Sequence, residues 1–301
     1  MSDTAIFERH RAHLLNIAYR MLGEMTAAED VAQEAWLRWQ RVDATEIRDP
    51  RAWLSAATVR LSLDALRRLR ARRETYVGPW LPEPILPDDA RAFAADAPAA
   101  RAELASDLSL ALLHVLERLS PEERAALILH DAFDCDYGEI AATLEKSEDA
   151  CRKLVTRARE RVRSGRTKHH ITREQHHDLL ARFAAASVSN DPKQLETLFA
   201  PDVIAYTDGG GRVTAALNPI YGADKVIRFM LGLGKKFTGR GTPGMSLTDV
   251  NGEPGLILTL DGALFAAATI EVHDGRIAGI YVVRNPEKLA RLAAAVSGPS
   301  P

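Results

Sequence analysis

Basic side chains are concentrated in segment 136–166, which has the pattern of two short helices joined by a tight turn. Most of them lie in the second helix, whose residues away from the apolar side are Arg152, Lys153, Thr156, Arg157, Arg159 and Arg163. Arginine and lysine neutralise DNA phosphates and donate hydrogen bonds to the edges of bases. These residue types therefore indicate nucleic-acid recognition.

The apolar residues of this segment indicate how the basic side chains are held. In the first helix they follow helical spacing at Tyr137, Ile140, Ala141 and Leu144. In the second they are Cys151, Leu154, Val155, Ala158 and Val162. Ser147 can cap the second helix, and Glu148 and Asp149 place negative charge in its first turn, where the helix dipole favours it. The pattern predicts a helix-turn-helix that enters the major groove; a helical bundle with a solvated basic face is the alternative.

Charge is strongly segregated along the chain, although the formal net charge is only −2. Residues 47–73 carry 8 basic against 2 acidic side chains, and residues 150–170 carry 8 against 1. Residues 74–149 between them carry 5 against 17. Two basic segments on either side of an acidic one suggest two separate nucleic-acid contacts.

The length of 301 residues allows two or three domains. Cys135 and Cys151 are the only cysteines, too few for a disulfide framework, so we expect a reducing, cytoplasmic setting. The sequence has no run of 18 apolar residues and no apolar region of the export-signal kind near its start. We therefore expect neither an export signal nor a membrane span.

Three amphipathic helices are predicted in the first part of the chain, at 4–22, 26–39 and 50–72. A capping box of Thr26 and Glu29 begins the second, and the Asp49–Pro50 pair begins the third. The tryptophans that have helical spacing, and are therefore assigned to the core, are Trp36, Trp39 and Trp53. The second helix also carries a compact acidic edge, which is either solvated surface or a docking site for a basic partner: Glu29, Asp30, Gln33 and Glu34.

Segment 74–101 loses the helical periodicity, and its prolines predict an acidic linker of extended character. Within it, residues 76–84 combine tyrosine, tryptophan and leucine, which disordered linkers seldom do, so we expect this part to dock elsewhere on the protein. Helices resume near Glu103, and Ser120 and Glu123 form a further capping box. Together with the helix-turn-helix, these helices make a second, four-helix domain.

Several motifs, in this order, resemble bacterial RNA polymerase sigma factors. Residues 27–38 (Ala-Ala-Glu-Asp-Val-Ala-Gln-Glu-Ala-Trp-Leu-Arg) look like the helix that docks on the polymerase clamp. Residues 49–54 (Asp-Pro-Arg-Ala-Trp-Leu) and 61–67 are similar to the helix that reads the −10 promoter element. The segments that match the domain reading the −35 element are Leu119-Ser-Pro-Glu-Glu-Arg124, Ile140-Ala141 and Arg157-Ala158-Arg159. The order and the missing intermediate domain resemble the extracytoplasmic-function class, with Glu145 as a departure where glycine is common.

The resemblance implies a transcription initiation factor that binds core RNA polymerase and directs it to promoter DNA, without catalytic residues of its own. It assigns polymerase binding to Asp30, Gln33 and Glu34. It assigns DNA binding to Arg48, Arg51, Arg60, Asp64, Arg67, Arg68, Ser147, Arg152, Lys153, Thr156, Arg157 and Arg159. Within the last helix, Arg152 and Lys153 are expected at base edges. The side chains expected at phosphates are Arg157, Arg159, Arg161 and Arg163.

Residues 171–296 follow a different pattern. The predicted helices are 179–188, 191–199 and 222–233, and the predicted strands are 255–260, 263–272 and 276–283. The strands are separated by two hairpin signals, Asp261-Gly262 and Asp274-Gly275. Helices followed by a curved meander give an α+β cone that resembles the SnoaL-like fold. Because that fold hosts both enzymes and simple pockets, it does not assign a function.

A subgroup of extracytoplasmic-function sigma factors carries such a domain at the C-terminus, and three of its marks are similar here. They are Trp-Leu-Pro-Glu-Pro at 80–84, Asp-Gly-Gly-Gly at 208–211 and Asn-Pro-Glu-Lys-Leu at 285–289. The resemblance implies that the appended domain tunes the sigma core in place of a separate anti-sigma protein. The residues assigned to this regulatory contact are Trp80, Leu81, Pro82, Asp208, Gly209, Gly210, Asn285, Pro286 and Lys288.

The implied fold is multidomain, with two all-α sigma domains, the second containing the helix-turn-helix, and a C-terminal α+β SnoaL-like cone. Its parts are region 2 at 1–73, a proline-rich linker at 74–102, region 4 at 103–168 and the cone at 171–296.

Four histidines and a set of polar side chains in the cone allow other interpretations. His169, His170, His176 and His177 lack a carboxylate or cysteine to complete a metal site, so we expect no metal and no cofactor. The side chains that can line the cone as acid–base groups of an isomerase or cyclase are Tyr206, Asp208, Tyr221, Arg228 and His273. The glycine-rich turn around Asp208 favours a structural role instead, and a small-molecule ligand in the cone is left open. The main alternative function is a ligand-responsive repressor that works without polymerase. Such a repressor has no need of an acidic edge that docks on the polymerase clamp. An enzyme fused to a DNA-binding domain is the third possible function.

Overall fold

The computed structural model describes residues 3–95, 108–165, 171–237, 239 and 241–296. They belong to two compact units. The first consists of Met1–Thr75, Asp88–Leu108 and Val115–Arg166, and the second of Tyr76–Pro87, Ser109–His114 and Thr167–Pro301. The aromatic segment of the predicted linker, residues 76–84, thus belongs to the same unit as the C-terminal domain. The helix expected near Glu103 lies outside the described residues.

The first unit opens with three helices, α1 (Asp3–Leu22), α2 (Met25–Trp39) and α3 (Pro50–Arg73), with a 3-10 turn at Ala44–Glu46. The predicted start of α3 is confirmed, because the Asp49 side chain accepts the Ala52 amide at 3.0 Å. The predicted capping box at Thr26 is wrong: α2 begins at Met25, whose side chain is buried, and Glu24 precedes it without a side-chain cap. Trp39 is fully buried, with its ring 5.4 Å from that of Trp53, which confirms a core role.

The remaining helices of this part of the chain are α4 (Pro87–Ala95), α6 (Leu110–Leu116), α7 (Pro121–Leu127), α8 (Tyr137–Leu144) and α9 (Glu148–Gly165). A π-helical turn, Ile128–Ala132, follows α7. The capping box of Ser120 and Glu123 is confirmed in both directions. The linker is less extended than predicted, because α4 forms there and buries Phe93, whose carbonyl accepts the Asn16 side-chain amide at 3.0 Å.

The second unit contains a six-stranded sheet in the order β2-β1-β6-β5-β4-β3. Its strands are β1 (Phe199–Asp208), β2 (Ile220–Tyr221), β3 (Pro243–Val250), β4 (Glu253–Leu260), β5 (Ala263–His273) and β6 (Arg276–Val283). The last three were predicted, and both hairpin turns place their Asp-Gly pairs at positive φ. The first three were not predicted. β1 pairs in parallel with β6, and the other pairs are antiparallel.

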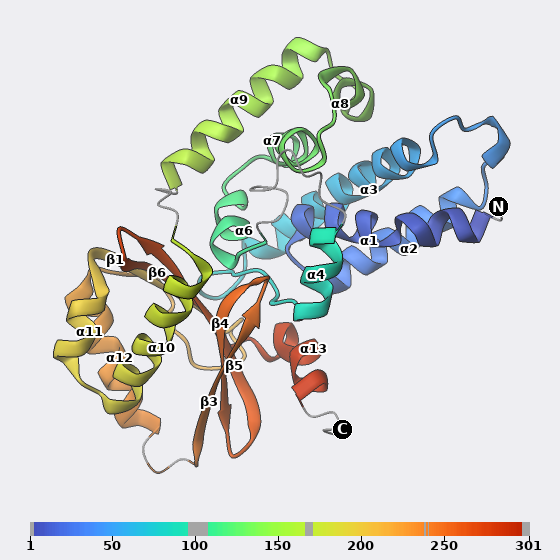
Figure 1. Cartoon of the computed structure of the whole chain (residues 1–301). Coiled ribbons are helices and arrows are strands. Elements are labelled where there is room, and N and C mark those ends of the chain that lie inside the picture. Colours follow the sequence, from blue (N-terminus) through green and yellow to red (C-terminus); the bar gives the residue numbers. More distant parts are fainter. Residues whose placement is uncertain (1–2, 96–107, 166–170, 238, 240, 297–301) are drawn as a thin grey trace. The chain divides into compact units, whose positions relative to one another are not determined.

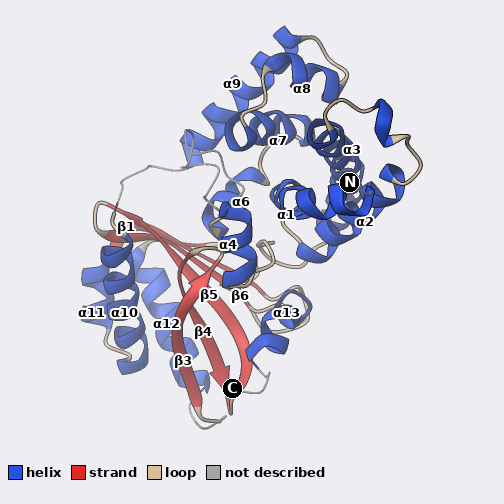
Figure 2. Cartoon of the chain, turned by 45° about the vertical axis from the view of Figure 1, so that its right-hand side comes forward, coloured by secondary structure: helices blue, strands red, loops and turns tan. Residues whose placement is uncertain are grey.

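Helices cover both faces of this sheet (Figures 1 and 2). On one face lie α10 (Arg173–Ser189), α11 (Pro192–Leu198) and α12 (Ala223–Phe237), and on the other lies α13 (Pro286–Val296), which was not predicted. The three helices share an apolar core with Ala268, Ile270 and Ile280. The opposite core joins Leu289 of α13 to Tyr281 of β6. This arrangement confirms the α+β cone.

Candidate functional site

The turn between α8 and α9 depends on one residue with left-handed backbone geometry. α8 ends at Leu144 and is followed by Glu145, whose φ of 55° is a conformation that glycine adopts most easily. The amide of Lys146 donates to the carbonyl of Ala141 at 3.1 Å, and the Ser147 hydroxyl accepts the amide of Ala150 at 3.3 Å. The predicted helix-turn-helix is therefore present (Figure 1), with glutamate at the position where glycine is common.

The N-terminal half of α9 presents polar side chains to solvent. The apolar side of the helix is buried as predicted, through Cys151, Leu154, Val155 and Ala158. Lys153 and Thr156 are exposed. Arg152 lies over the ring of Tyr137 at 4.9 Å and forms an ion pair with Glu148 at 3.0 Å within its own helix. This arrangement suits a helix that reads base edges with its first turns.

The C-terminal half of α9 differs, because three of its arginines are bound to carboxylates of the same unit. Arg157 and Arg161 both donate to Glu123, at 3.2 and 2.5 Å. Arg159 makes a bidentate pair with Asp131, in which its Nε lies 2.9 Å from Oδ2. The sequence pattern predicted phosphate contacts for these three arginines. It gave no indication that carboxylates of the same unit would form ion pairs with them.

The pKa values of two members of these ion pairs, Glu123 and Arg159, are shifted. Burial by itself would raise the pKa of Glu123, but hydrogen bonds from Ser120 and the charges of Arg161 and Arg157 bring that pKa below its ordinary value. The hydrogen bonds to Asp131 raise the pKa of Arg159. The lowered pKa keeps Glu123 ionised beneath the recognition helix.

The arginines of α3 and of the loop before it that were assigned to DNA binding are exposed, but not all of them are free of internal partners. Arg48, Arg51 and Arg68 are exposed. Arg60, also exposed, donates from Nε to the carbonyl of Thr143 at 3.0 Å and from Nη2 to that of Ala142 at 2.8 Å. The helix that resembles a −10 reader thus contacts the C-terminal end of α8.

Arg67 of α3 is exposed and makes its shortest contact within its own helix. Its Nη1 donates to the Asp64 carboxylate at 3.1 Å, and its Nη2 lies 3.8 Å from Glu122 of α7. Asp64 is itself exposed. Both residues therefore stay at the surface of the unit, where solvent weakens such pairs.

A buried ionic cluster around Glu117 joins α3, α7 and the end of α6. Glu117 accepts from Arg73 and Arg124, while Arg73 also reaches Glu24 at 3.1 Å and Arg124 donates to the carbonyl of Arg20 at 2.9 Å. Burial alone would raise the pKa of Glu117, but the two arginines hold it below its ordinary value. Sequence analysis missed this cluster, because its members are far apart in the chain and each lies in an ordinary helical pattern.

The acidic edge of α2 is partly open. Asp30 and Gln33 are exposed, whereas Glu34 is half-buried and pairs with Arg38 at 3.3 Å. Two polar side chains one helical turn apart are therefore available on this edge to a basic partner.

In the second unit, the carboxylate of Asp208 is the centre of the contact with the linker motif. It is fully buried, and it accepts the Tyr76 hydroxyl at 2.6 Å, the Leu81 amide at 2.9 Å and the Lys288 ammonium at 2.7 Å. Lys288 also lies 4.2 Å from the centre of the Trp80 ring, in cation–π geometry. The predicted docking of the tryptophan-containing segment near Asp208 is therefore confirmed; its regulatory role stays a prediction.

Asn285 completes this site from the far end of β6. Its side-chain amide donates to the Tyr76 hydroxyl at 3.0 Å, and its side-chain oxygen accepts the Glu287 amide at 3.0 Å, which caps α13. Gly210 has a φ of 60°, and a Cβ there would lie 2.4 Å from the Asn285 amide. The glycine is needed for this close approach. Pro82 is buried. A Cβ at Gly209 would lie 2.4 Å from the carbonyl oxygen of Val213, so this position also has no room for a side chain.

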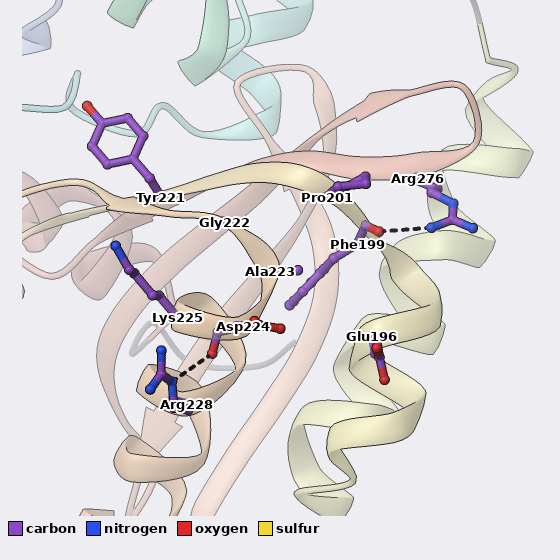
Figure 3. Close-up of a pocket in the computed structure, with 10 residues that line it drawn as sticks. All are labelled: Glu196, Phe199, Pro201, Tyr221, Gly222, Ala223, Asp224, Lys225, Arg228 and Arg276. Atoms are coloured by element: carbon purple, nitrogen blue, oxygen red, sulfur yellow. Dashed lines mark hydrogen bonds between the residues drawn. The ribbon is translucent and has the colours of Figure 1, made fainter.

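The acid–base constellation considered for the cone is not assembled. Tyr206 is buried and stacks on Tyr281 at 5.3 Å, while His273 pairs with Glu271 at 3.2 Å. Tyr221 and Arg228 instead line an open hollow of about 510 Å³ beside the start of α12 (Figure 3). Its lining residues are Glu196, Phe199, Pro201, Tyr221, Gly222, Ala223, Asp224, Lys225, Arg228 and Arg276.

The histidines do not form a metal site in the described part of the chain. His169 and His170 lie outside that part. His176 is half-buried, and burial lowers its pKa. Among the described residues, no three histidine, cysteine or acidic side chains are grouped in a way that could hold a metal ion.

Comparisons with known proteins agree with the geometry of the first unit. Sigma-70 region 2 matches residues 6–73, and Sigma-70 region 4 matches residues 109–162. ECF RNA polymerase sigma factor SigJ of Mycobacterium tuberculosis is 40% identical over 297 residues, which cover 95% of this chain and 93% of that protein. Probable ECF RNA polymerase sigma factor SigI of the same species is 31% identical, with coverage of 98% and 97%.

The whole fold also resembles a solved structure. The crystal structure of M. tuberculosis extracytoplasmic function sigma factor SigJ superposes with a TM-score of 0.74 and 36% identity, and covers 95% of this chain and 98% of that one. None of the helices in the described ranges has the length and apolar character needed to cross a membrane.

Proposed function

Because the chain belongs to the extracytoplasmic-function class of RNA polymerase sigma factors, we propose how its parts divide the work of transcription initiation. Residues 1–73 dock on core RNA polymerase and read the −10 element, and residues 103–168 read the −35 element. The linker 74–102 connects them, and residues 171–296 regulate both.

Polymerase docking uses the acidic edge of α2. Asp30 and Gln33 are exposed there, and Glu34 is held beside them by Arg38. A surface that carries carboxylates attracts a basic partner through complementary charge. The proposal therefore assigns these three residues to a basic surface of the polymerase.

Recognition of the −35 element uses the N-terminal half of α9. Ser147, Lys153 and Thr156 are exposed, and Arg152 is tied only by pairs within its own helix. Lysine and arginine at the start of a recognition helix reach base edges. Arg157 and Arg159 lie further along the helix, where they pair with Glu123 and Asp131.

Recognition of the −10 element uses the loop before α3 and the exposed side of α3. The residues assigned to it are Arg48, Arg51, Arg60, Asp64, Arg67 and Arg68, all of which are exposed. Exposed arginines attract the phosphates of an opened strand. Unpaired bases captured here favour strand separation, which costs a few kcal/mol per step.

Regulation uses the contact between the linker and the C-terminal domain. The motif around Trp80, Leu81 and Pro82 is anchored by Asp208 and Lys288. The linker also joins the two promoter-reading regions in sequence, so its anchoring limits how they can be arranged. We propose that this intramolecular contact takes the place of a separate anti-sigma protein.

The C-terminal domain works as a regulator and not as an enzyme. The side chains considered for acid–base catalysis lie apart, since Tyr221 and Arg228 line the hollow beside α12 while Asp208 is occupied by the linker. No cofactor is needed for this role. An unidentified small molecule is retained as a candidate partner of the domain, and the cytoplasm, where the polymerase works, as its compartment.

The observation that carries this proposal is the exposed recognition face of α9 in a chain whose relatives are sigma factors. The test combines purified core polymerase and the full chain on a promoter library, with transcripts identified by sequencing. We expect transcripts from promoters that share two elements at a fixed spacing. Association with core polymerase should be lost in Asp30→Lys and kept in Glu174→Lys, a matched charge reversal on the exposed side of α10.

A chain that fails to associate with core polymerase, yet binds intact duplex operators tightly by itself, would contradict the proposal. That result would favour the repressor alternative.

A further inference from the structure

The two halves of α9 differ in what their cations contact. In the C-terminal half, Arg157 and Arg161 lie one turn apart on the same side of the helix and share the carboxylate of Glu123. Arg159 is bound by both carboxylate oxygens of Asp131. In the N-terminal half, Lys153 is exposed and makes no ion pair with any described residue.

The carboxylates are fixed, whereas the arginines lie at the rim. The Glu123 side chain is only 4% exposed, and the amide of Ser120 donates to it at 2.9 Å. Asp131 is 17% exposed and lies 2.8 Å from His130 Nδ1. The three arginines are 40–55% exposed. They could therefore reach DNA if the carboxylates released them.

Release is unfavourable, because it would leave a buried anion without its cation. Removing one partner from a buried ion pair costs much more than separating an exposed pair. Arg152 illustrates the difference, since its partners Glu148 and Asp149 are 53% and 84% exposed and are readily replaced by water or phosphate. The carboxylates beneath α9 thus hold back cations that a DNA-binding helix would otherwise offer to phosphates.

We propose that Glu123 and Asp131 are specificity-determining positioning residues, which withhold Arg157, Arg159 and Arg161 from the DNA backbone. The inference rests on the proposed role of α9 at the −35 element. Phosphate contacts add affinity for every sequence, whereas base contacts at the start of the helix discriminate between sequences. Withholding three cations lowers binding to all DNA and leaves base contacts as the larger share of affinity.

The test uses Glu123→Gln and Asp131→Asn in the full chain. Glutamine can keep the capping interaction with Ser120, because capping boxes accept Glu or Gln at this position. The matched control is Glu160→Gln, which removes the same charge from an exposed position of α9 without releasing an arginine. Binding is measured, over a salt series, to duplexes carrying the −35 sequence recovered from the promoter library and to scrambled duplexes. Thermal unfolding of the same samples confirms that each variant is folded.

We expect both variants to bind scrambled duplexes about tenfold more tightly than the parent chain. Each released phosphate contact should steepen the dependence of log affinity on log salt by about 0.9, so Glu123→Gln steepens it by up to two such steps and Asp131→Asn by one. The ratio of matched to scrambled affinity should fall in both variants. Glu160→Gln should leave the slope unchanged.

Two outcomes would overturn the inference. One is a dependence of log affinity on log salt that is as steep in both variants as in Glu160→Gln. The other is an equal gain of affinity for matched and for scrambled duplexes. If Glu123→Gln does not fold, the result for Asp131→Asn decides. Failure of the proposed function is separate, because in that case the parent chain itself, bound to core polymerase, would not distinguish the matched from the scrambled −35 sequence.

Discussion

Replacement of Asp208 by asparagine tests whether one buried carboxylate holds the linker motif on the C-terminal domain. The carboxylate accepts from Tyr76, Leu81, Lys288 and the amide of Gly210. Asparagine keeps one acceptor oxygen and no charge. Lys288, whose side chain is 8% exposed, would then remain in the site without its anion.

The size of the effect follows from that stranded charge. Breaking a buried ion pair by removing one partner costs about 3–5 kcal/mol. Since about 1.4 kcal/mol corresponds to a factor of ten, docking of the segment should weaken by about 10²–10⁴-fold. The loss falls on the docked state, because both side chains are hydrated once the segment leaves.

Hydrogen exchange at two backbone amides gives the readout. The Leu81 amide is bound by Asp208 at 2.9 Å, and the Ile85 amide is bound by Asn251 at 3.1 Å. If the segment leaves as a unit, Asp208→Asn should reduce the protection of both amides. The control is Asp202→Asn, an exposed carboxylate on the same strand. Unchanged protection of Leu81, or a loss equal to that in the control, would refute the role given to this carboxylate.

Three further predictions concern the first unit. Lys153→Ala should relax −35 selectivity by about 1–3 kcal/mol, whereas Arg163→Ala should weaken all sequences alike and lower the salt slope by about one; equal effects of both variants on matched and scrambled promoters would contradict this division. His13 is buried, and its pKa is lowered to about 3, first by burial and then by the charge of Arg51, so the folded state excludes its proton. The stability that the neutral side chain permits is fully present above pH 6.5, and the free energy of unfolding should fall by about 2 kcal/mol between pH 7 and pH 5. Denaturant titration should find this loss reduced in His13→Gln. Glu145→Gly should stabilise the unit by about 0.5–1 kcal/mol because of the φ of 55°, and an unchanged or lower melting temperature would argue against strain at this turn.

Features set by neighbouring residues could be predicted from the sequence. The cap at Asp49 and the capping box at Ser120 are decided within one helical turn, and both are present. Gly23 follows α1 with a φ of 68°, a left-handed geometry that glycine commonly supplies at the end of a helix. Thr26 failed as a cap for a tertiary reason, since the burial of Met25 places the helix start before it.

Features that depend on distant partners could not be predicted. β1 has no strict alternation because Pro201 and Asp202 interrupt it, and its pairing with β6 is parallel, without a hairpin signal. The carboxylate–arginine pairs beneath α9 join residues 28 to 38 positions apart. Composition indicated only that the aromatic segment of the linker docks somewhere, and the residues around Asp208 were assigned to this contact through the family resemblance. No local pattern identifies the Asp208 carboxylate as the partner of the Leu81 amide.

The polar bonds between α3 and the end of α8 are of a kind that water can replace. Arg60 donates to two carbonyls at the negative end of α8, and because its side chain is exposed, a DNA phosphate can compete for the same guanidinium. The pairs of Arg73 and Arg124 with Glu117 lie deeper, with side-chain exposures of 0–16%, so removal of Glu117 alone would leave two cations there without their anion and would be costly. In the proposed role of α3 at the −10 element, the bonds of Arg60 therefore position the helix and still permit Arg60 to exchange an internal partner for a DNA phosphate.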